Sequence, residues 1–135
     1  MGSMRLAASL MSVLVFLAAV ARGSFADVVA KGPHGGIVRE AEGMHIEFVI
    51  DKDGTPKLYL YDKAMKPSAR MDLEARLTVK GHDGEQHRRG LRAYRDPKEG
   101  VLYTAEPIRG SSDWDTAVVS IKVKDQWHHI RFSHH

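Results

Sequence analysis

Beyond residue 40, apolar and polar residues alternate with a period of two along most of this 135-residue chain. Successive side chains of a β-strand point to opposite faces, so this pattern predicts strands with one buried face. Residues 44–51 show it most clearly, with Met44, Ile46, Phe48 and Ile50 on one face. No stretch keeps a helical period over the roughly 11 residues that identify a helix. The chain is therefore expected to be all-β.

Turn-forming residues divide the alternating segments into short strands. Asp51-Lys52-Asp53-Gly54 and Gly81-His82-Asp83-Gly84 are hairpin signals. The expected strands cover residues 44–51, 57–62, 73–80, 86–94, 101–105, 116–124 and 127–132. Short strands at this spacing are typical of a sandwich or small barrel. We expect a single antiparallel β-sandwich, immunoglobulin-like or similar, over residues 27–135.

The first 26 residues have the three-part pattern of a secretory signal peptide. Arg5 gives a basic start, residues 6–20 are almost wholly apolar, and small residues follow. The apolar run is shorter than the roughly 20 residues of a membrane-spanning helix. We expect cleavage after Ala26 and export to the periplasm, with no stable membrane insertion after processing. Cleavage after Ala21 and an uncleaved anchor are the alternatives.

Composition excludes several classes of function. The chain has no cysteine, so disulfides, cysteine-type zinc sites, iron–sulfur ligation and thiol catalysis are excluded. Residues 1–26 contain two arginines and no acid, so the remaining 109 residues carry a formal charge of +1. This near-neutral charge gives no support for nucleic-acid binding. A basic cluster at residues 87–95 is interpreted as a solvated strand and loop. No nucleophile elbow or phosphate loop is present, and we expect no enzymatic activity.

Histidine is the most informative residue type. All eight histidines follow residue 26, and His45-Ile46-Glu47 places an imidazole and a carboxylate on one strand face. Such a pair suits Cu²⁺, Zn²⁺, Ni²⁺ or Co²⁺. His128 and His129 are adjacent and point to opposite faces of their strand, so one of them is expected to join His45 if the strands are neighbours. The expected metal ligands are His34, His45, Glu47, His128 and His129.

Each of these histidines also has a plainer interpretation. His34 would be a solvated side chain of a Gly/Pro loop, and His45 and Glu47 would form a polar solvent face. His82 and His87 flank a hairpin turn, where they either approach each other or stay exposed. His134 and His135 form a C-terminal tail that would bind cations weakly.

A resemblance is carried by three short motifs: Gly32-Pro33-His34-Gly35-Gly36, Met44-His45-Ile46-Glu47-Phe48-Val49, and Leu58-Tyr59-Leu60-Tyr61-Asp62 with Lys66-Pro67. Together they resemble a small periplasmic β-domain. That domain occurs alone and in the adaptor (membrane fusion) subunits of heavy-metal efflux pumps of Gram-negative bacteria. The resemblance covers roughly residues 31–67 and implies metal handling in the periplasm, with His34, His45 and Glu47 as the implicated residues.

The expected function is therefore binding of a divalent transition metal by an exported protein, as a buffer or delivery protein linked to efflux. The expected partners are the metal ion and a component of an efflux system. Neutral imidazole is the ligand form, so affinity should fall as the pH drops through about 6.5. The alternative is a non-catalytic interaction or adaptor domain, with outward Tyr59, Tyr61 and Trp127 as its anchors.

Overall fold

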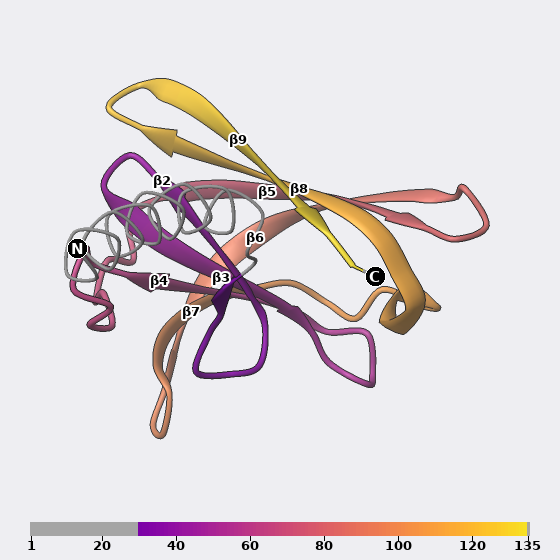
Figure 1. Ribbon diagram of the computed structural model, residues 1–135, viewed down its shortest axis with the longest axis horizontal. Helices are drawn as coiled ribbons and strands as arrows, with labels where there is room; N and C mark the ends of the chain where they lie inside the picture. Colours follow the sequence, from indigo (N-terminus) through magenta and orange to yellow (C-terminus); the bar gives the residue numbers. More distant parts are fainter. Residues whose placement is uncertain (1–29, 135) are drawn as a thin grey trace, which may run out of the picture.

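The computed structural model describes residues 30–134, which form nine strands and one short 3-10 helix (Figure 1). The expected signal peptide lies outside the described residues. The elements are β1 (Ala30–Lys31), β2 (Ile37–Ala41), β3 (Met44–Ile50), β4 (Pro56–Tyr61), β5 (Glu74–Gly81), β6 (Gln86–Asp96), β7 (Gly100–Thr104), η1 (Ser111–Asp113), β8 (Trp114–Val123) and β9 (Gln126–Ser133).

All strand pairs are antiparallel and build one continuous sheet in the order β1-β2-β3-β4-β7-β6-β5-β8-β9. Strand β6 joins the two halves of this sheet. Its first part, from Gln86 to Leu91, pairs with β5, and its second part, from Arg92 to Asp96, pairs with β7. The chain therefore passes from one half to the other within a single strand.

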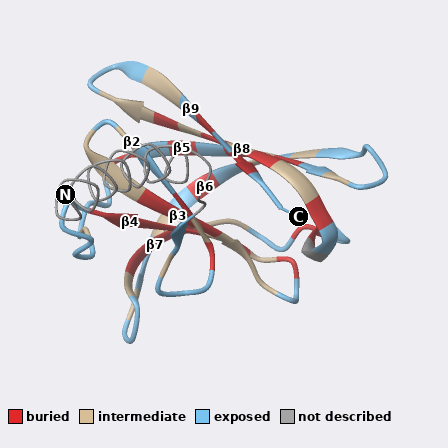
Figure 2. Ribbon diagram, viewed as in Figure 1, coloured by how far each residue is buried: buried red, intermediate tan, exposed pale blue. Residues whose placement is uncertain are grey.

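The sheet curls so that the inner faces of its two halves share one hydrophobic core (Figure 2). Phe48 of β3 lies at the junction, with its ring centroid 5.4 Å from those of Trp114 on β8 and Phe132 on β9. Inward residues of β5 and β8, such as Leu77 and Val119, are at most 1% exposed. Aromatic contacts at this distance add to the stabilisation from buried area.

The all-β antiparallel class is confirmed, and the seven expected strands are present with ends shifted by a few residues. A two-sheet sandwich is not confirmed, because β6 makes the sheet continuous. The sequence pattern missed β1, which has only two residues, and β2, whose residues Ile37-Val38-Arg39-Glu40-Ala41 do not alternate between apolar and polar. Within residues 30–134, no helix has the length and hydropathy needed to cross a bilayer.

Replacing Phe48 tests whether its contacts with the rings of Trp114 and Phe132 hold the two halves of the sheet together. We expect Phe48→Ala to lower the free energy of unfolding by about 3–5 kcal/mol, since it leaves a cavity between β3 and β9. The matched control is Tyr94→Ala, because Tyr94 is 51% exposed. Denaturant unfolding measures both, and equal losses in the two variants would contradict the assigned core.

Candidate functional site

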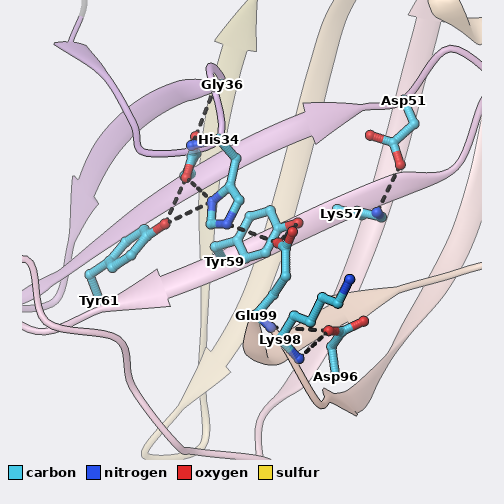
Figure 3. Close-up of polar contacts among 10 residues, drawn as sticks. His34, Gly36, Asp51, Lys57, Tyr59, Tyr61, Asp96, Lys98 and Glu99 are labelled. Carbon is cyan, nitrogen blue, oxygen red and sulfur yellow. Dashed lines mark hydrogen bonds and ion pairs between the residues drawn. The ribbon is translucent and has the colours of Figure 1, made fainter.

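A tight hairpin between β1 and β2 covers part of the outer face of the sheet. The amide of Gly35 donates to the carbonyl of Gly32 at 3.0 Å, and the amide of Gly32 donates to the carbonyl of Gly36 at 2.9 Å. Gly35 has a φ of 78°, which glycine adopts without the steric cost of a Cβ. The turn brings His34 over β3 and β4 (Figure 3).

Glu47 is the centre of this site, and its side chain is fully buried. One carboxylate oxygen accepts bonds from the backbone amides of His34 at 2.8 Å and Gly36 at 2.9 Å. The other oxygen accepts from the Tyr61 hydroxyl at 2.7 Å and lies 2.9 Å from His34 Nδ1. A buried charge is tolerated when it is paired and hydrogen-bonded in this way.

Strand register explains why a carboxylate on the outer face is buried. Glu47 stands opposite Val38 of β2 and Tyr59 of β4. Tyr59, Tyr61 and Leu102 form a small outer hydrophobic cluster beside it, and each is at most 4% exposed. The β1–β2 hairpin and this cluster together exclude water from a face that alternation alone predicts to be solvated.

His34 lies between two carboxylates (Figure 3). Its ring stacks on Tyr59 with a centroid separation of 3.6 Å and an interplanar angle of 6°. Nδ1 faces Glu47, whereas Nε2 lies 2.9 Å from a carboxylate oxygen of Glu99. The side chain keeps 27% of its surface exposed, so the edge near Glu99 is accessible from solution.

Glu99 is positioned by the turn between β6 and β7. The Asp96 carboxylate accepts the backbone amides of Lys98 at 2.8 Å and Glu99 at 3.0 Å, which holds the turn. These bonds lower the pKa of Asp96. The Tyr59 hydroxyl donates to Glu99 at 2.8 Å. The Glu99 carboxylate therefore points at His34 and stays partly exposed.

The titratable groups are shifted by burial and by one another. Burial alone raises the pKa of Glu47, but the bonds from His34, Tyr61 and Gly36 outweigh it and hold this pKa below the ordinary value of 4.5. Burial, followed by the bond to a carboxylate, raises the pKa values of Tyr59 and Tyr61. Both tyrosines therefore remain neutral hydrogen-bond donors.

The contacts constrain the proton positions on His34. A lone pair on Nδ1 facing the Glu47 carboxylate at 2.9 Å would be repulsive, so Nδ1 carries a proton and donates it. In the neutral ring, Nε2 then presents its lone pair to Glu99 at 2.9 Å. At this distance the contact is a hydrogen bond when Nε2 carries hydrogen, and a cation beside the two atoms could take both as ligands.

The structure brings together two of the five expected ligands, His34 and Glu47, and places the other three elsewhere. His45 Nδ1 lies 3.2 Å from the carbonyl of Asp62. His128 Nδ1 lies 3.4 Å from Glu42, and His129 Nδ1 lies 2.6 Å from the Ser120 hydroxyl. Among residues 30–134, no group of three or more His, Asp or Glu side chains is arranged to hold a metal ion.

One expectation about neighbouring residues needs correction. Tyr59 and Tyr61 are buried rather than outward anchors, because the β1–β2 hairpin and Leu102 cover that face. Of the two alternatives for the hairpin histidines, the structure fits the exposed one for His82, whose side chain is 56% exposed and lies 3.2 Å from Asp113. His87 is partly exposed and lies 3.8 Å from Glu85.

Sequence reasoning missed Glu99 and the polar role of the two tyrosines. The hairpin signal at residues 51–54 fixes the pairing of β3 with β4, and this places Tyr59 opposite Glu47. That signal was available in the sequence. Glu99 approaches through the pairing of β4 with β7, which joins segments more than forty residues apart. No local pattern reports that pairing.

Glycine is required at position 36 by the close approach of β3. A Cβ at Gly36 would stand 2.5 Å from the Phe48 carbonyl oxygen, whereas a Cβ at Gly90 would meet no heavy atom within 4 Å. We expect Gly36→Ala to lower the unfolding free energy by about 2–4 kcal/mol and Gly90→Ala to change it by about 0.5 kcal/mol or less. Thermal or denaturant unfolding tests the pair; a neutral Gly36→Ala would show that the hairpin is not held against β3.

The buried carboxylate should make stability depend on pH. Glu47 has a lower pKa in the folded chain than in the unfolded chain, so its charge stabilises the fold above about pH 4.5. This contribution is lost as the pH falls through the folded pKa. We expect Glu47→Gln to cost about 2–3 kcal/mol at neutral pH and less at pH 3.

Denaturant titrations of the wild type and Glu47→Gln from pH 7 to pH 3 measure this difference. Glu106→Gln is the control, since Glu106 is exposed in the loop after β7. A Glu47→Gln deficit that stays constant across this range would contradict a charged, hydrogen-bonded Glu47.

Comparison of the chain with protein-family models, with curated proteins and with solved structures gave no match. The geometry around His34 is therefore the basis of the proposed function. The resemblance to the efflux-associated β-domain remains an expectation from three motifs.

Proposed function

We propose that this protein binds a divalent transition-metal ion (Cu, Zn, Ni or Co) through Nε2 of His34 and the carboxylate of Glu99. One observation carries the proposal: the His34 ring has a buried carboxylate on Nδ1 and a partly exposed carboxylate 2.9 Å from Nε2. A cation that lies beside these two atoms binds both the ring nitrogen and the carboxylate oxygen.

Glu47 acts as the orienting partner rather than as a ligand. Metal-binding histidines commonly donate their other ring N–H to a carboxylate, which fixes the tautomer and raises the basicity of the ligating nitrogen. Glu47 accepts from His34 Nδ1 at 2.9 Å and is itself held by Gly36 and Tyr61. Stacking on Tyr59 restricts rotation of the ring. The histidine is thus preorganised before a metal arrives.

The spacing of the two ligand atoms suits one ion. Typical bond lengths of about 2.0–2.2 Å to nitrogen and oxygen allow atoms 2.9 Å apart to share a metal at an angle of about 90°. Two protein ligands leave the other coordination positions to water or to a partner's side chains. An open site of this kind exchanges its metal readily, which fits a buffer or delivery protein better than a permanent structural centre.

The proposed setting is the periplasm, in connection with metal efflux. Its support is the signal-like segment at residues 1–26 and the resemblance of residues 31–67, in which His34 and Glu47 are implicated residues. The proposal changes the ligand set derived from the motifs. Glu99 enters it, Glu47 moves to the orienting position, and His45, His128 and His129 are left out.

Calorimetric titration of the full chain with Cu²⁺, Zn²⁺, Ni²⁺ and Co²⁺ tests the ligand pair. All proteins carry His134→Ala and His135→Ala, which removes the two C-terminal histidines as a source of binding. His134 is not the loose tail residue expected from the sequence, because its ring stacks on Trp114 at a centroid separation of 4.8 Å. We expect Glu99→Gln to weaken binding of the preferred ion at least about tenfold and to change the unfolding free energy by less than about 1 kcal/mol, because Glu99 is partly exposed.

Two controls separate this site from its alternatives. Glu106→Gln removes an exposed carboxylate elsewhere and should leave the affinity unchanged. His45→Ala removes the ligand expected from the His-x-Glu motif and should also leave it unchanged. Wild-type affinity in Glu99→Gln overturns the His34–Glu99 pair, and loss of binding in His45→Ala favours the motif-derived set.

A further inference from the structure

One outer face of the sheet is strongly basic. It belongs to the first part of β6 and to β5, β8 and β9, which are neighbours in the sheet and are labelled in Figure 1. The residues that alternate with the buried core positions of these strands include five cations and one carboxylate. We call this surface the basic face; its charged residues are Arg76, Lys80, Arg88, Lys122, Arg131 and Glu74.

Strand register places these residues side by side across the sheet. Thr78 is opposite Arg88 on one side and Val118 on the other, and Val118 is opposite Arg131, so two arginines end one row. Arg76 lies in the next row, opposite Gly90. Because Gly90 has no side chain, a shallow hollow of about 270 Å³ opens there, lined in part by Arg76 and Arg88.

A tryptophan completes the basic face. Trp127 of β9 is opposite Lys122, and the guanidinium carbon of Arg76 lies 4.4 Å from the centroid of its ring. Trp127 is partly exposed, in contrast to Trp114, which is 4% exposed in the core. A partly exposed indole among cations suits the boundary between water and lipid headgroups.

The charge of the basic face is a local asymmetry. Its five cations and one carboxylate give a net charge of +4, whereas the whole chain carries +3 with neutral histidines. The rest of the chain is therefore slightly negative. Such a field orients the molecule toward an anionic surface and depends on ionic strength.

We propose that the basic face docks on the surface of a bilayer that contains anionic phospholipids. Its cations are spread over four strands, as expected for contact with many phosphate groups, and its outward apolar residues are few. Each lysine or arginine near such a surface contributes about a fivefold gain in affinity. His34 lies in the β1–β2 hairpin and Glu99 in the β6–β7 turn, beside β3 and β4 in the other half of the sheet, so docking leaves that site accessible.

Partitioning of the full chain onto phosphatidylglycerol and onto phosphatidylcholine vesicles tests the proposal. The apolar residues 6–20 are present in every variant, so the readout is the ratio of anionic to neutral partitioning. We expect Arg88→Glu/Arg131→Glu to lower this ratio at least about 25-fold, and higher salt to lower it in the wild type.

The matched control is Lys52→Glu/Lys63→Glu, which makes the same change in net charge at exposed turns outside the basic face. It should stay within about threefold of the wild type. Cooperative thermal unfolding confirms that both double variants are folded. Equal ratios in the wild type and Arg88→Glu/Arg131→Glu, or equal losses in the two double variants, overturn the proposal.

Fluorescence gives an independent measure of orientation. Brominated phosphatidylglycerol should quench the wild type, and Trp127→Phe should abolish the quenching, since Trp114 is buried. Quenching that persists in Trp127→Phe contradicts docking through this face. Binding to single-stranded DNA with the same dependence on Arg88 and Arg131, and none to vesicles, overturns the proposal in favour of a nucleic-acid surface.

Discussion

The buried carboxylate of Glu47 is the interaction on which the rest of the site depends. A charge that has lost its water must be satisfied by protein donors, and here they come from the β1–β2 hairpin and from β4. This single requirement explains the glycines that let the hairpin approach, the orientation of the Tyr61 hydroxyl toward Glu47 and the fixed ring of His34. The position of the proposed metal site therefore follows from the need to pair the buried Glu47 carboxylate with hydrogen-bond donors.

The two outer faces of the sheet differ in how they manage polar groups. The face of β3, β4 and β7 is partly covered, and its carboxylates and hydroxyls bond to one another around His34. The face of β5, β6, β8 and β9 stays open, and its cations remain in water. A single fold thus presents a preorganised polar site on one half and a diffuse charged surface on the other, and the two proposals rest on different residues.

Local sequence patterns predicted the strands well because alternation reports directly on one-sided burial. They also placed Leu58 and Tyr59 on opposite faces. They failed at Glu47, since a charged residue opposite the core face is read as solvated unless a covering element is known. That cover is the β1–β2 hairpin, whose two short strands show no alternation, and Glu99 is brought near by the long-range pairing of β4 with β7. Local alternation reports neither that a hairpin covers an outer face nor that strands distant in the sequence pair with each other.

Strand β6 has a consequence for how this chain folds. The hairpins β3–β4, β5–β6 and β8–β9 are local, but β4–β7 and β5–β8 close loops of about forty residues. Neither half of the sheet is complete until β6 has paired with both β5 and β7. We therefore expect the halves to unfold as one cooperative unit, at the moderate rates typical of high-contact-order β proteins.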